Sequence, residues 1–486
     1  MKNKIYFLII TTIFGGILIL LFSFNITSNR QVHLDHIDIK DKRELFIDNY
    51  LIEEMNGASL VKHMPKDEGA VLFFDKSWEG PYSAYCTVIE DNGLYQLYYR
   101  GNGTICYAES KDGRSWSKPN LGLHRVGNSS ENNVIIFDDY PVTHNFSPFL
   151  DKNPKTDPSQ KYKAVGGKDS LGLMAYTSAD GIRWTKLQQK PIITKGTFDS
   201  QNVVFWSEEE LRYICYFRIW SEGNFIRKRG FRTIARTTSK DFINWTEPVA
   251  MSFGDTPMEH LYTQQTSPYF RAPHIYIAIG ARFMPGRKVI NENQAKEIGV
   301  NLDYYNDCSD VYLMSSRGGD KYDRYFMESF IRPGIGPDNW SSRSNYPALN
   351  IVQTGRTEMS TYVAKNYAQK NAHLSRHSMR IDGISSLEAG YQGGEVVTKS
   401  FLFSGSELEI NYSTSAAGEI RIELLDEHGS VIKGYTHDDC DPIIGDEISK
   451  IVSWHGNKNL GHLTSKPIRL KMYLKDSNLF SFKFTN

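Results

Sequence analysis

A short motif that recurs four times along this 486-residue chain constrains its fold more than any other feature. Each copy begins with serine and ends with an aromatic residue six positions later: residues 110–116, 178–184, 239–245 and, in degenerate form, 316–322. Each copy follows a run of strand-forming residues. Its Asp and Gly residues are typical of turns, against which the aromatic ring can pack. We therefore expect each motif in the turn between the outer strands of a small antiparallel sheet.

The spacing of the four copies predicts the architecture. Their closing aromatic residues, Trp116, Trp184, Trp245 and Tyr322, are separated by 68, 61 and 77 residues. Intervals of this length hold about four short strands each and are typical of β-propeller blades rather than of solenoid turns. The alternative is that Asp-Gly turns before aromatic residues arose by chance in a β-rich chain.

Five segments match the expected blades, each with a polar-rich inner strand followed by a second strand that usually carries aromatic residues. We place the inner strands near residues 83–90, 145–150, 200–206, 263–270 and 345–352. The second strands are expected near residues 95–100, 162–165, 212–218, 275–282 and 358–365. In a ring of blades the inner strands surround an axis, and we expect a substrate pocket at the end of the axis where these strands begin.

The two ends of the chain differ from this pattern. After about residue 392, polar and apolar residues alternate tightly, which is typical of an antiparallel sheet with one exposed face. Residues 5–24 carry no charged side chain, are long enough to span a bilayer, and follow two lysines. The predicted fold is all-β: a signal peptide or membrane-spanning signal anchor (1–24), a linker (25–42), a five-bladed β-propeller (43–391) and a β-sandwich (392–486).

The apolar N-terminal segment predicts an exported protein. The protein is either anchored in the membrane and facing the extracytoplasmic side or, if the segment is cleaved, secreted or periplasmic. Lys plus Arg and Asp plus Glu both number 56, so no net charge attracts the chain to nucleic acid. Because no motif for a nucleotide phosphate or zinc is present, we expect no cofactor and no metal. The sequence leaves the oligomeric state open.

Five cysteines are scattered along the chain without metal-type spacing. Most are expected to be buried thiols in strands. In an oxidising compartment, Cys86 and Cys106 could form a disulfide between neighbouring strands of one blade.

Four short stretches carry a resemblance to a known superfamily: residues 45–52 (LFIDNYLI), 78–83 (WEGPYS), 332–334 (RPG) and 344–349 (SNYPAL). They look like uncharacterised bacterial proteins labelled glycosyl hydrolase family 32 N-terminal-like, in the arabinanase, levansucrase and invertase superfamily of families 32 and 43. The resemblance covers about residues 43–486 and implies a five-bladed propeller that acts on carbohydrate. The family 32 motifs Trp-x-Asn-Asp-Pro-x-Gly, Arg-Asp-Pro and Glu-Cys are not intact here, so fructan hydrolysis is not implied.

Hydrolysis of a glycosidic bond usually needs one ionised and one protonated carboxyl group. Asp199 precedes an inner strand and is followed by Ser, Gln and Asn, which could hold it ionised, so it is our candidate general base or nucleophile. Glu358 begins the second strand of the last blade, where desolvation could keep it protonated as the general acid. The alternatives are an Asp that caps a strand turn and a surface Glu at the end of a hairpin.

Glu79 and Glu259, ahead of the first and fourth inner strands, are further candidates for the acid. Polar residues on the expected blades are predicted to bind substrate: Arg100, Asp151, Gln201, Asn202, Arg218, Gln264, Arg282, Arg343 and Tyr346. Arginines at repeated positions round a ring can form a cationic collar for the carboxylate or sulfate of an acidic sugar. They can equally pair with neighbouring acids. A basic run at 227–232 could contact an anionic polymer, although most such runs are only solvated.

The predicted function is an exported glycoside hydrolase that cleaves a poly- or oligosaccharide, acidic sugars among them, through paired carboxylates at the propeller axis. Its expected partners are the carbohydrate and, through the N-terminal segment, the membrane. Two alternatives stay open: a carbohydrate-binding propeller without catalysis, and a scaffold for protein interaction.

Overall fold

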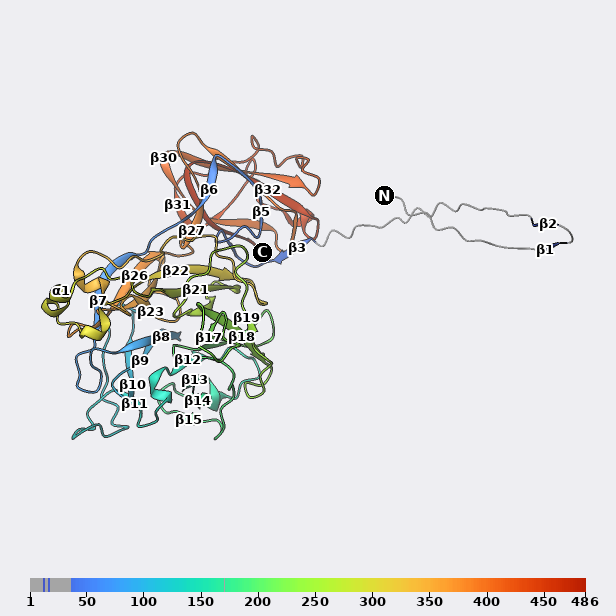
Figure 1. The fold of residues 1–486 in the computed structure, drawn as a ribbon. Helices are drawn as coiled ribbons and strands as arrows, with labels where there is room; N and C mark the ends of the chain where they lie inside the picture. The colour runs from blue at the N-terminus through green and yellow to red at the C-terminus, as the bar shows by residue number, and fades with distance from the viewer. Residues whose placement is uncertain (1–11, 14–15, 18–35, 170) are drawn as a thin grey trace. The chain divides into compact units, whose positions relative to one another are not determined.

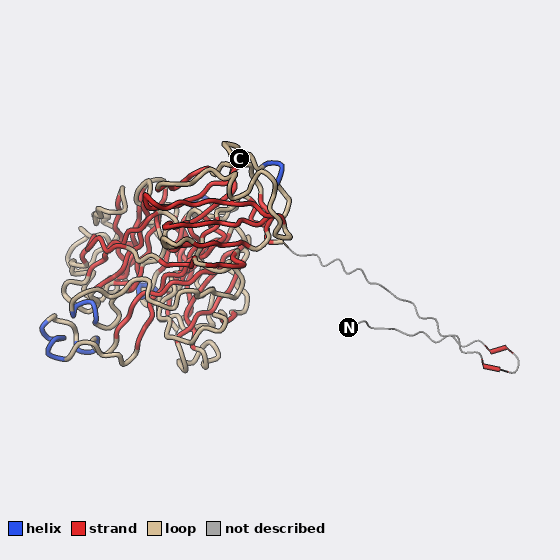
Figure 2. Tube along the Cα trace, turned by 90° about the horizontal axis from the view of Figure 1, so that it is seen from above, coloured by secondary structure: helices blue, strands red, loops and turns tan. Residues whose placement is uncertain are grey.

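The computed structural model describes residues 12–13, 16–17, 36–169 and 171–486. These residues form β-strands and loops, with short helical turns and one α-helix, α1 (Glu292–Glu297). Figure 2 shows strands through most of the chain and helix in a few short segments. The predicted all-β class is confirmed.

Five antiparallel sheets follow one another and form the blades of a propeller (Figure 1). The inner and second strands lie where the sequence predicts them. The strands are β8 (Ala84–Asp91), β9 (Leu94–Arg100), β10 (Thr104–Ser110) and β11 (Val134–Phe137) in the first blade; β12 (Ser147–Leu150), β13 (Tyr162–Lys168), β14 (Gly172–Ser178) and β15 (Thr185–Lys186) in the second; β16 (Val203–Ser207), β17 (Arg212–Trp220), β18 (Arg232–Ser239) and β19 (Val249–Ala250) in the third; β20 (Thr266–Tyr269), β21 (Ala272–Met284) and β22 (Cys308–Ser316) in the fourth; and β23 (Tyr346–Pro347), β24 (Val352–Gln353), β25 (Glu358–Lys365) and β26 (His373–Arg380), joined by β7 (Lys66–Phe73), in the fifth.

Backbone hydrogen bonds between the first and last inner strands close the ring. The amide of Val88 donates to the carbonyl of Leu349 (3.1 Å), and the amide of Leu349 donates to the carbonyl of Cys86 (2.9 Å). The contact is a parallel bridge, as expected for inner strands that run in one direction along a common axis. The end of the axis where these strands begin is called here the N-terminal end of the ring, and the opposite end its C-terminal end.

The repeated motif forms the turn after the third strand of a blade, as predicted. In the second blade the hydroxyl of Ser178 donates to Oδ1 of Asp180 (3.0 Å), which also accepts the backbone amide of Arg183 (2.8 Å). Nε1 of Trp184 then donates to the carbonyl of Gly181 (3.0 Å). The copies in the first and third blades make the same serine-to-aspartate bond. The turn therefore satisfies its own polar groups.

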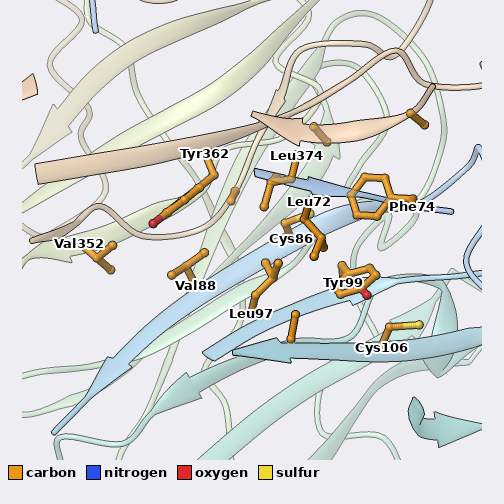
Figure 3. Packing of buried hydrophobic residues seen from close by; sticks show 14 of the residues in the cluster. Leu72, Phe74, Cys86, Val88, Leu97, Tyr99, Cys106, Val352, Tyr362 and Leu374 are labelled. Atoms are coloured by element: carbon orange, nitrogen blue, oxygen red, sulfur yellow. The ribbon is translucent and has the colours of Figure 1, made fainter. Parts of the chain in front are cut away.

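The strand that precedes the first blade completes the last one, because β7 pairs antiparallel with β26. Figure 3 shows Leu72 and Phe74 from this segment among the same buried side chains as Val88 of β8 and Leu374 of β26. Burial of each large apolar side chain contributes roughly 1.5 to 3 kcal/mol. Packing and strand pairing together hold the ring closed.

Ten further strands form one branched sheet, the C-terminal sheet, in the region predicted as a sandwich. They are β3 (Ile37–Lys40), β4 (Glu44–Leu45), β5 (Ile52–Asn56), β6 (Ala58–Lys62), β27 (Ser385–Ala389), β28 (Gly394–Thr398), β29 (Phe401–Phe403), β30 (Glu407–Asp426), β31 (Asp446–Ile451) and β32 (Ile468–Thr485). Figure 1 shows β3, β5 and β6 in blue beside orange and red strands of the C-terminus.

The predicted domain boundaries need correction at both ends of the propeller. The predicted linker (25–42) contains β3, and the predicted propeller (43–391) contains β4, β5, β6 and β27 of the C-terminal sheet. Lys62 of β6, for example, pairs with Ser385 of β27. Pairing between segments so distant in sequence leaves no local pattern, which is why alternation alone did not reveal it.

Most of the predicted membrane segment (1–24) and most of the predicted linker (25–42) lie outside the described residues. From this part the structure describes β1 (Thr12–Ile13) and β2 (Gly16–Ile17), which pair with each other. Within the described ranges, no helix is long and apolar enough to cross a membrane.

All five cysteines are free thiols and all are buried, which confirms the expectation for most of them. The Cys86–Cys106 disulfide is not formed. β9 lies between β8 and β10, so the two cysteines are not on neighbouring strands, and Figure 3 shows their side chains apart. Burial raises the pKa of the Cys86 thiol to about 12.

Candidate functional site

Charged and aromatic side chains gather at the N-terminal end of the ring, and Asp199 lies among them. Asp199 precedes β16 and His144 precedes β12, so loops of neighbouring blades bring the two together. Nε2 of His144 lies 3.1 Å from Oδ1 of Asp199, and Nζ of Lys168 lies 3.7 Å from the same oxygen. Nη2 of Arg218 lies 3.6 Å from Oδ2. The Asp199 side chain is 30% exposed, so solvent reaches the carboxylate.

These neighbours set the charge of Asp199. Burial raises the pKa of its carboxyl, but the hydrogen bond from His144 and the charges of Arg218 and Lys168 outweigh burial and hold the pKa well below its usual range. Burial also lowers the pKa of His144 below that of a free imidazole. Near neutral pH the pair is therefore a carboxylate beside a neutral imidazole. The groups that keep Asp199 ionised lie on other segments, not in the amides that follow it.

Three arginines surround the ring of Tyr262, which lies in the loop before β20. The guanidinium carbons of Arg218 and Arg232 lie 5.2 and 5.3 Å from the ring centroid. Arg343, in the loop before β23, hydrogen-bonds to the phenol. Burial raises the pKa of Tyr262, but the charges of Arg218 and Arg343 outweigh burial and lower it. Segments of the third, fourth and fifth blades thus meet at one phenol.

Tyrosines fill the N-terminal end of the ring between the arginines. Tyr85, Tyr262 and Tyr346 belong to one buried cluster, and the ring centroids of Tyr262 and Tyr346 lie 5.2 Å apart. Tyr85 lies at a bulge in β8 with a φ of 54°, and the guanidinium carbon of Arg100 lies 4.7 Å from its ring centroid. Arg343 also has a left-handed φ, of 61°. Such strained non-glycine residues concentrate at functional sites.

Arg100, Arg218, Arg343 and Tyr346 of the predicted binding residues therefore meet at this end, whereas Arg282 is paired with acids. Its guanidinium donates to Asp310 (2.8 and 2.6 Å) and to Glu259 (3.2 Å). Glu259 lies at the same end of the ring, because Leu261 bridges to Arg282 near the end of β21. Its second carboxylate oxygen pairs with Arg324. Both oxygens of Glu259 are thus neutralised by arginine.

Glu358 lies at the opposite end of the ring from Asp199. It begins β25, which runs antiparallel to β23 and β24, so this residue lies where the inner strands finish. Its carboxylate accepts hydrogen bonds from Thr354 (2.8 Å), Arg114 (2.9 Å) and Arg376 (2.9 Å). Burial raises the pKa of Glu358, but these partners outweigh burial and lower it. The expectation of a protonated Glu358 facing Asp199 is corrected: the two acids lie apart, and Glu358 is ionised near neutral pH.

Glu79 and Asp151 are held in buried contacts, and both side chains are 0% exposed. Glu79 accepts hydrogen bonds from the hydroxyl of Tyr99 (2.5 Å) and Nζ of Lys118 (2.7 Å). Asp151 pairs with Lys163 and follows β12, which places it at the C-terminal end of the ring. A sugar cannot contact either carboxylate in this structure.

The predicted binding amides Gln201, Asn202 and Gln264 are also buried, and they hold the inner strands. Nε2 of Gln201 donates to Oγ1 of Thr87 (2.9 Å), which joins the third blade to the first. Nδ2 of Asn202 donates to the carbonyl of Ser200 (2.9 Å), and Nε2 of Gln264 donates to a backbone carbonyl of the third blade (3.1 Å). Gln201 and Asn202 therefore position the loop of Asp199, and Gln264 joins the fourth blade to the third.

A cavity of about 1000 Å³ opens at the C-terminal end of the ring, whereas the sequence predicts a pocket at the N-terminal end. Its wall includes Trp206 and Phe270, and its rim includes Glu90, Lys111 and Lys152. At the N-terminal end, buried tyrosines occupy the space around the axis, which explains the difference. The perturbed carboxylate and the concentration of arginines nevertheless favour the N-terminal end as the chemical site.

Sequence reasoning did not identify His144 or Lys168, and Arg232 stood out only as the last residue of a basic run. The signal that could have identified these three residues is their position relative to the predicted strands. His144 immediately precedes the predicted second inner strand, Lys168 ends β13, and Arg232 begins β18. All three positions fall at the N-terminal end of the ring, because second strands end there and third strands begin there.

No protein-family model and no curated protein matches the chain. Solved structures similar to it include an N-acetylgalactosamine deacetylase from F. plautii (12% identity, 68% of this chain and 97% of that chain, TM-score 0.42). Another is a glycoside hydrolase family 43 arabinoxylan arabinofuranohydrolase from Bacillus subtilis (10% identity, 86% and 99%, TM-score 0.38). A third is an α-L-arabinanase from Penicillium chrysogenum (12% identity, 66% and 99%, TM-score 0.39). At these identities and TM-scores the similarity carries no argument about activity.

Proposed function

We propose that the chain is a glycoside hydrolase that cleaves its substrate at the N-terminal end of the ring, beside Asp199. One observation carries the proposal. A carboxylate at the start of an inner strand is kept ionised by His144, Arg218 and Lys168 while 30% of its side chain stays exposed. Asp199 is therefore both charged and accessible. A group that attacks the anomeric carbon or activates water must be both.

Asp199 supplies the negative charge that glycoside cleavage needs. A carboxylate beside the anomeric carbon can attack it or activate a water molecule, and in both roles it stabilises positive charge that develops on the sugar ring. Nε2 of the neutral His144 imidazole lies 3.1 Å from Oδ1 of Asp199 and so restricts the position of that oxygen. Oδ2, 3.6 Å from Arg218, is less tightly held and is the oxygen we assign to the reaction.

The leaving oxygen needs a proton from a second group. Glu358 lies at the wrong end of the ring to supply it. Glu259 shares the end with Asp199 and its side chain is 22% exposed, so it is the acid we assign among those predicted from the sequence. Its ion pairs with Arg282 and Arg324 have to open before it can carry a proton.

Release of reducing sugar from a panel of polysaccharides by the full chain tests this assignment. Asp199→Asn keeps the shape of the side chain but removes its charge, and we expect turnover to fall by at least about 100-fold. Asp303→Asn, at an exposed position in a short 3-10 helix (Leu302–Tyr304), is the matched control and should keep wild-type turnover. Wild-type turnover by Asp199→Asn would contradict the proposal.

A carbohydrate-binding propeller without catalysis is the second candidate. It is favoured by the separation of Glu358 from Asp199 and by the arginines that neutralise Glu259. A glycan array and a long incubation distinguish the two candidates. A selective binder that releases no sugar from the glycans it binds supports this second function.

Export also remains part of the proposal, supported by the apolar, uncharged residues 5–24. Fractionation of cells that produce the full chain with a C-terminal tag tests it. We expect the tag in the membrane fraction, accessible to added protease, or outside the cell. A tag that is protected in the soluble cytoplasm contradicts export.

A further inference from the structure

Several buried hydrogen-bond donors at the N-terminal end of the ring have no acceptor among the described residues. They include Nε of Arg218, Nε of Arg232, Nε1 of Trp220 and the hydroxyl of Tyr346. Arg218 is 4% exposed and Tyr346 is 3% exposed, so water satisfies these groups poorly. Buried polar groups are nearly always paired in folded proteins. Unpaired donors gathered in one place indicate an acceptor that the described part of the chain does not supply.

The positive charge of this cluster exceeds the negative charge around it. Among the described residues, Arg232 has no carboxylate partner. Its guanidinium lies 3.4 Å from Nδ1 of His260, and its carbon lies 4.6 Å from the ring centroid of Trp220. Arg343 has no ion pair in the described ranges, and Arg218 has one, to Asp199 at 3.6 Å. Of these three guanidinium groups, only Arg218 therefore has a carboxylate partner among the described residues.

The arginines also disfavour one another. Burial lowers the pKa of Arg232, and the charges of Arg218 and Arg343 lower it further. An anion bound between these groups would remove the mutual repulsion and accept the free N–H donors. The ring centroids of Trp220 and Tyr262 lie 4.6 and 5.3 Å from the guanidinium carbon of Arg232, and aromatic rings can cover the apolar face of a sugar.

We propose that Arg218, Arg232 and Arg343 bind the anionic group of an acidic sugar, a carboxylate or a sulfate ester, placed beside Asp199. The planar fork of a guanidinium group matches the paired oxygens of both anions. Trp220 and Tyr346 provide further donors. The sugar class rests on the proposed function above, whereas the anion site does not depend on catalysis.

Binding is measured by calorimetry with the full chain at low salt, using three probes: a galacturonic acid oligosaccharide, a sulfated galactan oligosaccharide and a neutral galactan oligosaccharide. We expect at least one charged probe to bind ten times more tightly than the neutral probe, or better. Added salt should weaken that preference. Preference for the first probe identifies a carboxylate, and preference for the second identifies a sulfate ester. Equal affinity for all three probes overturns the inference.

Arg232→Met tests the site directly, because it keeps the apolar stem and removes the charge. We expect a loss of roughly 10- to 100-fold in affinity for the charged probe and no change for the neutral one. Arg227→Met, at an exposed position of the same basic run, is the control and should bind as the wild type does. If thermal unfolding shows that Arg232→Met does not fold, Arg343→Met is the substitute. A folded variant with wild-type affinity for the charged probe contradicts the site.

The two proposals fail in different ways. A chain that prefers charged sugars but cleaves no glycan contradicts the hydrolase and supports the anion site. A chain that cleaves neutral glycans and shows no preference for charge supports the hydrolase and overturns the anion site.

Discussion

The charge state of Asp199 depends on side chains from three separate segments. His144, Lys168 and Arg218 come from the loop before β12, the end of β13 and the end of β17. Glu358 is likewise ionised, but its partners at the other end of the ring stabilise the fold rather than a site. The two acids thus have different roles because Asp199 precedes an inner strand, at the N-terminal end of the ring, whereas Glu358 begins a second strand, at the C-terminal end.

We predict that Glu358→Gln leaves glycan turnover unchanged and lowers the free energy of unfolding by about 1 kcal/mol, since a partly exposed ion pair is lost. Denaturant unfolding and reducing-sugar release on the same samples measure both effects. Glu247→Gln, whose side chain is 83% exposed in its pair with Lys195, is the control and should change neither. Loss of turnover in folded Glu358→Gln would return this residue to the catalytic site.

At the scale of single residues, the sequence predicted some of the candidate site residues and missed others. It located Asp199 at the start of an inner strand, because polar residues there follow from the blade pattern. It misplaced Glu358, since the first residue of a second strand lies at the opposite end from the first residue of an inner strand. It could not reveal His144, an isolated histidine whose role depends on a neighbouring blade.

β7 closes the ring, and its charged contacts to the fifth blade are partly buried. Asp67 in β7 accepts a hydrogen bond from Nζ of Lys365 (2.6 Å) and lies 3.7 Å from Nε2 of His377. Burial raises the pKa of Asp67, but Lys365, His377 and the amide of Gly69 lower it to about 2. Burial lowers the pKa of His377 to about 4, against the attraction of Asp67. The His377 imidazole is therefore neutral in the folded protein near neutral pH.

We predict that acid destabilises this closure between about pH 6.5 and 4. In that range the unfolded chain protonates His377 and the folded chain does not, so the free energy of unfolding falls as the pH falls. The contribution of the neutral His377 to the free energy of unfolding is complete above about pH 6.5 and amounts to at most roughly 3 kcal/mol. Asp67 adds a smaller loss as the pH drops from 3.8 towards about 2, because its side chain is 45% exposed.

Denaturant unfolding at stepped pH measures this dependence. His377→Gln cannot titrate, so its stability should change less between these pH values than that of the wild type. His428→Gln is the control, because the His428 side chain is 78% exposed, and it should keep the wild-type slope. Parallel slopes for His377→Gln and the wild type would show that this histidine does not set the acid response.

Elements with a local pattern could be predicted, and elements that depend on distant pairing could not. The inner and second strands follow from the repeated motif, its spacing and the composition of each strand. β7 belongs to the fifth blade only because it pairs with β26, far along the chain. The same holds for β5 and β6, which pair with β28 and β27. No feature within these short strands indicates the partner.

Buried charges join the propeller to the C-terminal sheet. The Asp382 side chain is 0% exposed and accepts hydrogen bonds from Arg271 of the fourth blade (2.8 Å) and from Ser481 of β32 (2.7 Å). The hydroxyl of Tyr269 donates to Oδ1 of Asp382 (2.7 Å), and Nη1 of Arg43 lies 3.5 Å from Oδ2, the oxygen that Arg271 and Ser481 contact. One carboxylate therefore connects strands of both parts.

We predict that Asp382→Asn lowers the free energy of unfolding by about 3 to 5 kcal/mol, because it leaves Arg271 without its buried counter-charge and leaves Arg43 with Glu409 alone. Asp446→Asn removes an acid that pairs with Arg380 and is 59% exposed, and it should cost less than about 1 kcal/mol. Guanidinium denaturation of both variants checks the contrast. If both variants lose the same small amount of unfolding free energy, the contact between the propeller and the C-terminal sheet does not depend on the Asp382 carboxylate.

For the whole molecule, the place where a sugar binds can be seen in a crystal structure of Asp199→Asn with a bound oligosaccharide. We expect the sugar at the N-terminal end of the ring, with one ring against Tyr262 and its anomeric carbon beside position 199. A sugar bound instead in the cavity at the C-terminal end, against Trp206 and Phe270, would contradict the assignment of the site.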